Sequence, residues 1–177
     1  GNEVALPQPD TGLDHFPFRM ATDPGGRIYA LLGTAEPATR VPRNLWVARS
    51  DDGGATWLPP ARVHAAGTAW GTFADMSVDD SGRVFVVWDD QTTSGVTIAR
   101  STDQGATFQR SPIASTSGGI SSVAASSGRV YVAWDTDVNA NLSTVQMRRS
   151  ADGGVTFDSA RTIRPAGCAQ PTLAIAA

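Results

Sequence analysis

The sequence predicts an all-β protein built from repeated four-stranded antiparallel units. An eight-residue segment with the pattern S-x-D-x-G-x-T-[WF] occurs three times, at offsets of 51 and then 49 residues. A Gly-Arg pair followed by two apolar residues precedes each copy, and the intervening segments are short β-branched and aromatic runs separated by turn residues, without a helical period. Repeats of about 50 residues with four strands each are typical of the blades of a β-propeller.

The second repeat shows the expected elements in order. Its strands are predicted at about 73–78, 83–89, 96–101 and 107–113, and the Asp79-Asp80-Ser81-Gly82 segment suits a tight turn between the first two. The same phase predicts three blades at about 14–65, 71–115 and 119–165. It also predicts an outer strand of a preceding blade near 3–7 and the inner strand of a fourth blade at 170–177, so that residues 1–177 form a single propeller segment.

Composition supports one globular domain and excludes several functions. The chain has 177 residues, of which 41% are hydrophobic and 18% charged, and it has no apolar run long enough to span a bilayer. Its net charge of -3 and scattered arginines argue against nucleic acid as a partner. A single cysteine, Cys168, and two distant histidines argue against a zinc site, and we expect no metal or other cofactor.

Three blades do not close a ring, and this predicts a partner. An open arc would leave apolar blade faces exposed to water. We therefore expect the missing blades to come from a second polypeptide or from the rest of the same gene product. Cys168 is unpaired within the chain, which predicts a partner thiol elsewhere.

The three eight-residue copies resemble the Asp-box, or BNR repeat, of sialidases and their non-catalytic relatives. The resemblance covers essentially the whole chain and implies a sialidase-like propeller of six blades that is extracellular, either secreted or on the cell surface. In each copy the aspartate can accept backbone N–H bonds, the serine can add hydroxyl bonds, the glycine can adopt positive φ and the aromatic residue can pack between blades. A metal-binding or catalytic role is the alternative, although one carboxylate per turn offers a hard cation few oxygens. The predicted structural set is Ser50, Asp52, Gly54, Thr56, Trp57, Ser101, Asp103, Gly105, Thr107, Phe108, Ser150, Asp152, Gly154, Thr156 and Phe157.

The loops at the opposite ends of the blades are the expected place for a binding site. Four aspartates follow tryptophans at the predicted ends of second strands, where they either bind a cation, a sugar hydroxyl or a basic ligand, or cap turns: Asp89, Asp90, Asp135 and Asp137. Trp70 lies in another predicted loop, where it either stacks on a sugar ring or packs between blades.

One further segment, Phe18-Arg19-Met20-Ala21, resembles the F-R-I-P element that opens the first sialidase blade. The resemblance implies that Arg19 helps to hold a substrate carboxylate with its guanidinium group. The family's general acid is an aspartate in the following loop, which here offers only Glu36, and the position expected for it is Arg43. The two tyrosines lie in apolar predicted strands and are poor matches to the family's nucleophile.

These observations favour a non-catalytic propeller module that binds a ligand, either a carbohydrate or a protein. One alternative is an exo-sialidase or related glycoside hydrolase, to which this chain would contribute Arg19 and Glu36. A second alternative is a structural scaffold.

Overall fold

The computed structural model describes residues 4–64, 71, 73–115, 120–139 and 142–167, and this part of the chain is entirely β-sheet and loop. Within these described residues, twelve strands form three four-stranded antiparallel sheets, which confirms the predicted all-β propeller architecture. Among the described residues there is no helix of the length and apolarity that crossing a membrane requires. The candidates Trp70 and Cys168 and the predicted fourth-blade strand at 170–177 lie outside the described residues.

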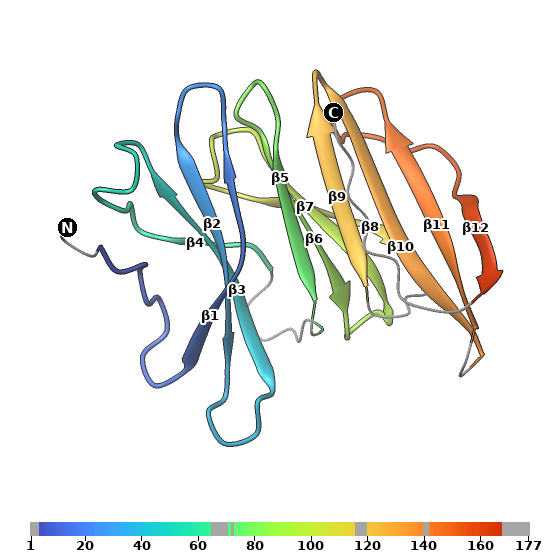
Figure 1. The fold of residues 1–177 in the computed structure, drawn as a ribbon, viewed down its shortest axis with the longest axis horizontal. Coiled ribbons are helices and arrows are strands. Elements are labelled where there is room, and N and C mark those ends of the chain that lie inside the picture. Colours follow the sequence, from blue (N-terminus) through green and yellow to red (C-terminus); the bar gives the residue numbers. More distant parts are fainter. Residues whose placement is uncertain (1–3, 65–70, 72, 116–119, 140–141, 168–177) are drawn as a thin grey trace.

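Each sheet is a blade whose strands follow one another in chain order, and the three blades lie side by side (Figure 1). The first strands, β1, β5 and β9, contact one another in sequence and form the inner edge. The first blade contains β1 (Asp14–Thr22), β2 (Ile28–Ala35), β3 (Pro42–Ser50) and β4 (Ala61–Arg62). The second contains β5 (Ala74–Val78), β6 (Val84–Asp90), β7 (Gly95–Ser101) and β8 (Gln109–Ala114). The third contains β9 (Ser121–Ser126), β10 (Arg129–Asn139), β11 (Leu142–Ser150) and β12 (Arg161–Gly167).

Apolar side chains on both faces of the middle strands pack the blades together. Alternate residues of a strand point to opposite faces, so a second strand such as β6 supplies both neighbouring interfaces. Val84, Val86 and Trp88 belong to the core between the first and second blades, whereas Phe85 and Val87 belong to the core between the second and third. This double burial explains why the second strands read as continuous apolar runs.

The N-terminal segment does not form the predicted outer strand, because residues 4–9 are irregular. The segment instead covers the face of the first blade that points away from the second. Leu6 packs there with Leu32, and the Asp10 carboxylate accepts hydrogen bonds from the Trp46 indole at 2.8 Å and from the Thr34 hydroxyl at 2.9 Å. Hydrogen bonds to the Asp10 carboxylate, instead of backbone pairing between strands, therefore attach this segment to the first blade.

Candidate functional site

The three eight-residue repeats, 50–57, 101–108 and 150–157, form tight loops after the third strands and are called the Asp turns below. In the first, Asp52 accepts bonds from the Thr56 backbone N–H at 2.8 Å and from the Thr56 hydroxyl at 2.6 Å. Ser50 donates to Asp52 at 2.8 Å and accepts from the Gly54 N–H at 2.8 Å. The other two turns repeat this network through Ser101, Asp103, Gly105 and Thr107 and through Ser150, Asp152, Gly154 and Thr156.

These bonds stabilise the ionised carboxylates. The side chain and backbone of Thr56 lower the pKa of Asp52 to about 2. Burial opposes ionisation of Asp103, but the Thr107 and Ser101 hydroxyls outweigh it and lower its pKa to about 2 as well. Bonds from Thr156 lower the pKa of Asp152 even further. Within the described ranges there is no group of three or more side chains that could hold a metal ion. The hydrogen bonds of each aspartate hold its turn closed.

The aromatic residues that end the Asp turns pack in two ways. Phe108 packs against the core between the first and second blades, and Phe157 packs against the core between the second and third. Trp57 lies instead with Leu6 and Trp46 on the face of the first blade that points away from the second.

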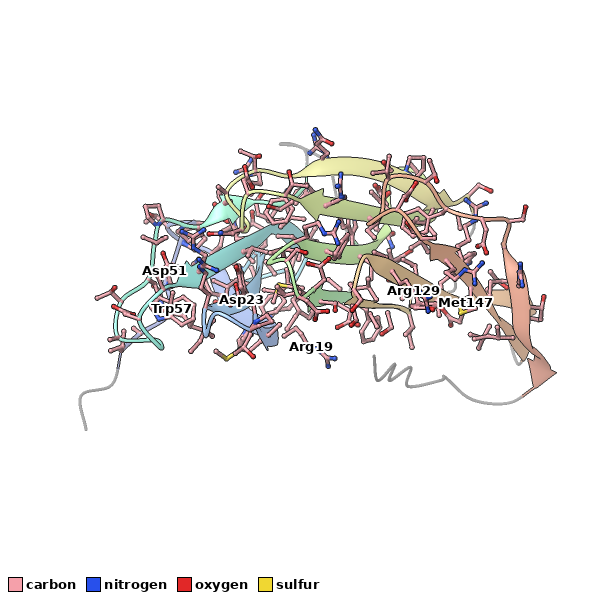
Figure 2. All side chains as sticks on the ribbon, turned by 90° about the horizontal axis from the view of Figure 1, so that it is seen from above. Arg19, Asp23, Asp51, Trp57, Arg129 and Met147 are labelled. Atoms are coloured by element: carbon pink, nitrogen blue, oxygen red, sulfur yellow. The ribbon has the colours of Figure 1, made fainter. Side chains whose placement is uncertain are left out.

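The turns between first and second strands contain carboxylate–arginine pairs that the sequence analysis did not predict. Asp23 is 6% exposed, binds the Arg27 guanidinium at 3.0 Å and accepts a bond from the Tyr29 hydroxyl. Burial and the Asp23 charge raise the pKa of Tyr29 to about 12. Asp79 makes the equivalent pair with Arg83, and the Asp-x-x-Gly-Arg spacing that both turns share was the available signal. Arg27 also reaches Asp51 at 3.5 Å, which places these turns on the same side as the Asp turns (Figure 2).

The inner edge carries the functional candidate Arg19. Its side chain is 56% exposed, projects from β1 and lies 3.3 Å, through Nε, from one oxygen of Asp75 on β5 (Figure 2). The other Asp75 oxygen accepts bonds from the Ser122 hydroxyl at 2.6 Å and the Val123 N–H at 3.1 Å, both on β9. A single chain of polar contacts thus joins the three inner strands. Sequence reasoning missed Asp75, although a carboxylate inside a predicted strand was a usable signal.

Glu36 lies elsewhere in the first blade. It follows the end of β2, where its carboxylate contacts Arg43 at 2.9 Å, and both side chains are exposed. Arg19 pairs with Leu31 in the sheet, which puts Glu36 about 15 Å farther along the strand direction. The structure therefore does not bring these two residues together.

The four aspartates expected just beyond the second strands lie within those strands. Asp89 and Asp90 end β6, and the Asp89 side chain, 8% exposed, accepts a bond from Gln91. Asp135 is 4% exposed within β10 and accepts a bond from the Ile120 N–H at 2.9 Å. The strand end predicted at Asp135 was wrong, because β10 continues to Asn139 and pairs with β11, with a register shift after Asp137. Asp137 belongs to the same strand, and its side chain lies outside the described part.

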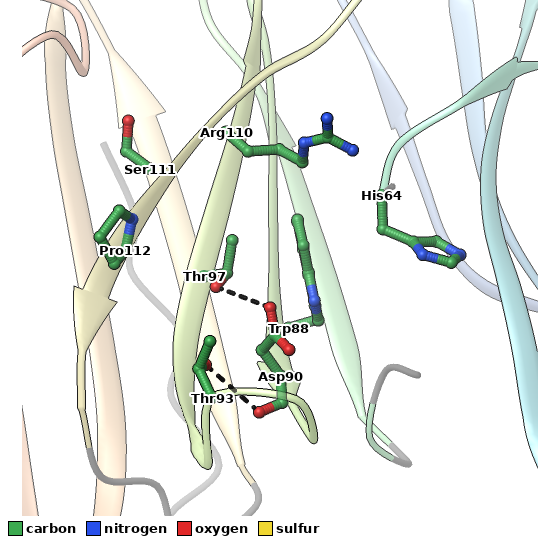
Figure 3. A pocket seen from close by; sticks show the side chains of 8 residues that line it. All are labelled: His64, Trp88, Asp90, Thr93, Thr97, Arg110, Ser111 and Pro112. Atoms are coloured by element: carbon green, nitrogen blue, oxygen red, sulfur yellow. Dashed lines mark hydrogen bonds between the residues drawn. The ribbon is translucent and has the colours of Figure 1, made fainter. Parts of the chain in front are cut away.

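Asp90 lines a cavity at the border between the first and second blades. The cavity measures about 330 Å³ and lies between the end of the first blade, marked by His64, and the strands β6 to β8 (Figure 3). Arg110 and Trp88 line its other sides. Asp90 is itself bonded to the hydroxyls of Thr92 at 2.6 Å and Thr97 at 3.1 Å.

Comparison with known proteins locates the fold. No family model and no curated protein matches the chain. A protein of unknown function from Dyadobacter fermentans aligns with a TM-score of 0.61 at 19% identity over 82% of this chain and 50% of its own. The Hadza microbial sialidase Hz136 aligns with a TM-score of 0.62 at 17% identity over 90% of this chain and 32% of its own. The Penicillium chrysogenum alpha-L-arabinanase complexed with arabinobiose aligns with a TM-score of 0.61 at 18% identity over 83% of this chain and 48% of its own. The chain therefore has the propeller fold found in a sialidase and an arabinanase, and it spans a third to a half of these proteins.

Proposed function

We propose that this chain is the non-catalytic, ligand-binding part of an extracellular propeller, and that Arg19 holds the carboxylate of an acidic sugar. The observation that carries the proposal is the exposed Arg19 guanidinium on the innermost strand, positioned by Asp75. Asp75 is itself fixed by two bonds from β9, so the arginine sits on a rigid support. A guanidinium held through Nε can direct the N–H groups at the edge of its plane to a carboxylate, which is the geometry that bidentate recognition requires.

Two observations support the carbohydrate part of the proposal. The fold is shared with proteins whose names are sialidase and alpha-L-arabinanase. The Asp turns also resemble the Asp-box in residue pattern, and their network serves the scaffold. We include in the proposal that further blades, from a second polypeptide or the same gene product, complete the ring around Arg19.

The non-catalytic part rests on the partners of the candidate acids. Glu36 is engaged by Arg43 and lies about 15 Å from the Arg19 position along the blade. Asp75, the carboxylate next to Arg19, has both oxygens engaged. Neither arrangement leaves a proton donor beside the arginine, and this favours binding over the glycosidase alternative.

Calorimetric titration with N-acetylneuraminate tests the proposal. We expect the wild-type chain to bind and Arg19→Ala to lose about 10- to 100-fold in affinity, as expected when a charge-assisted hydrogen bond is removed. Arg161→Ala is the matched control, because Arg161 is 69% exposed and lies on the outermost strand β12. Equal affinity in Arg19→Ala and wild type would contradict the binding role. Turnover of a fluorogenic sialoside that is abolished by Arg19→Ala would favour the enzyme.

A further inference from the structure

The three blades place different groups at one set of equivalent positions, which we call the distal rungs. Counting from the serine that ends the third strand in each Asp turn, the rungs are the residues six and four positions earlier, together with their partners on the second strand. They are Thr34, Asn44, Leu32 and Trp46 in the first blade, Asp90, Gly95, Trp88 and Thr97 in the second, and Thr136, Thr144, Trp134 and Gln146 in the third.

In the first blade the distal rungs bind a carboxylate. One oxygen of Asp10 accepts bonds from Thr34, Asn44 and Trp46 at 2.8 to 2.9 Å. Burial opposes ionisation of Asp10, yet the three donors and the charge of Arg62 lower its pKa. Arg62 lies over the Trp46 ring at 4.8 Å and supplies the positive charge at this position.

In the second blade the rungs contain their own carboxylate. Asp90 occupies the place of Thr34 and accepts a bond from the Thr97 hydroxyl at 3.1 Å. The hydroxyl and backbone N–H of Thr92 complete its partners at 2.6 and 3.0 Å. The Thr97 hydroxyl of this blade therefore has an anionic acceptor within the chain.

In the third blade the described residues place no carboxylate at the rungs, and the Trp134 indole is left without an acceptor there. A cavity of about 460 Å³ is lined by Trp134, Thr136, Gln146 and Arg148, with Ser115 from the second blade at its border. Trp134 is 2% exposed, and its Nε1 is buried without a hydrogen-bond partner. The buried Nε of Arg148 also lacks a partner, and no carboxylate of the described residues forms an ion pair with this side chain.

We infer that this cavity binds the carboxylate of a small molecule of about monosaccharide size. The unpaired indole N–H and the arginine require an acceptor, and the charge of Arg148 favours an anionic one. Thr136 and Gln146 line the cavity with groups that already bond to Thr144 at 2.6 Å and to Thr162 at 2.8 Å, so the buried donors left unpaired among the described lining residues are those of Trp134 and Arg148. The volume falls within the usual range for small-ligand sites. The equivalent rungs of the first blade already hold the Asp10 carboxylate, so a carboxylate fits at this position of a blade.

The inferred site is distinct from Arg19. Arg19 lies on β1 at the inner edge, whereas the cavity is lined by β10 and β11 of the third blade and the end of the second. A binding measurement made in an Arg19→Ala background therefore reports on the cavity independently of the proposed function.

Indole N–H resonances of the ¹⁵N-labelled Arg19→Ala chain provide the test. The sequence has five tryptophans, which Trp→Phe variants assign one at a time. We expect titration with sodium glucuronate to shift the Trp134 resonance to saturation, and the same concentration of glucose to leave it unchanged. N-acetyl aspartate amide is titrated as a third probe. If it binds more tightly than glucuronate, the cavity is still a carboxylate site, and its ligand is a peptide side chain instead of a sugar acid.

Variants decide whether the named donors bind the probe. Trp134→Phe and Arg148→Gln should each weaken glucuronate binding at least tenfold. Binding to Trp134→Phe is measured by calorimetry, because this variant lacks the Trp134 resonance. Trp88→Phe is the matched control, since Trp88 occupies the equivalent rung of the second blade and is equally buried. Arg149→Gln is the charge control, because Arg149 is the next residue of β11 and pairs with Asp158. Arg148 is only half-buried, so its variant remains informative if Trp134→Phe fails to fold. An unshifted Trp134 resonance, equal binding of glucose, or unchanged affinity in both variants would overturn the inference.

Discussion

The two ends of the same strands contrast sharply. At one end the three Asp turns repeat a single hydrogen-bond network with the same four residue types. At the other end the distal rungs differ in every blade: a carboxylate from the N-terminal segment in the first, Asp90 in the second, and the unpaired indole N–H of Trp134 in the third. The serine, aspartate and threonine side chains of each Asp turn find their hydrogen-bond partners within the same turn. The polar groups of the distal rungs find different partners in each blade, and in the first blade the partner comes from the N-terminal segment.

The difference has a physical origin. Each Asp turn must satisfy the same backbone N–H groups while the chain reverses, and Gly105, with φ of +82°, shows that the reversal also requires positive φ. Because the same backbone N–H groups need acceptors in every Asp turn, the same serine and aspartate side chains recur in all three. The distal rungs carry no such shared requirement, because they lie within paired strands and contain no chain reversal. Repetition therefore marks the scaffold, and departure from it marks the candidate sites.

The largest expected effect tests the role of the Asp-turn aromatics in joining blades. Phe108→Ala removes a half-buried ring that packs against the core between the first and second blades, and we expect it to lower the free energy of unfolding by about 3 kcal/mol. Urea unfolding followed by circular dichroism measures the loss. Val155→Ala, at a position 61% exposed in the third Asp turn, is the control and should cost less than about 0.5 kcal/mol. Similar losses in both variants would show that the ring does not join the blades.

A smaller effect is expected from the turn network itself. Asp103→Ala removes the acceptor for the Thr107 N–H and hydroxyl, and because this turn is exposed to water we expect a loss of about 1 to 2 kcal/mol. Thr102→Ala changes the neighbouring exposed residue of the same turn and should be nearly neutral. Unfolding midpoints of the two variants at pH 7 measure the difference. An unchanged binding affinity in Asp103→Ala would assign the residue to the scaffold, whereas selective loss of binding with unchanged melting would reverse that assignment.

The scaffold was predictable from the sequence because its physical requirements are local. The spacing of Ser50, Asp52 and Thr56 contains all the partners of the turn, and the phase of the three copies predicts the sheets. The strand ends were less predictable, since β10 extends four residues beyond Asp135 by pairing with β11.

The candidate sites depend on contacts between distant segments, which local patterns do not record. Asp75 reaches Ser122 across 47 residues, and Asp10 reaches Trp46 across 36. Sequence reasoning found Arg19 through a local motif but missed the Asp75 that positions it. It singled out Trp134 only as a landmark for Asp135, because an unpaired indole N–H is visible only when the surrounding side chains are in place.

The smallest expected effect is the pH dependence that the Asp turns give to stability. The folded-state pKa of Asp103 is about 2, below its ordinary 3.8, so ionisation of this carboxyl stabilises the fold above pH 3.8 and the contribution is lost as the pH falls through 2. The side chain is exposed and water screens it, so we expect Asp103 to contribute less than about 1 kcal/mol to this acid limb. Asp52, with a similar pKa, acts in the same direction. Urea unfolding at several values between pH 5 and pH 2 should therefore show a shallower decline for Asp103→Asn than for wild type, because an amide does not titrate in this range. Thr102→Ala should retain the wild-type slope, and an Asp103→Asn slope equal to it would show that the turn does not hold the carboxylate in its ionised form.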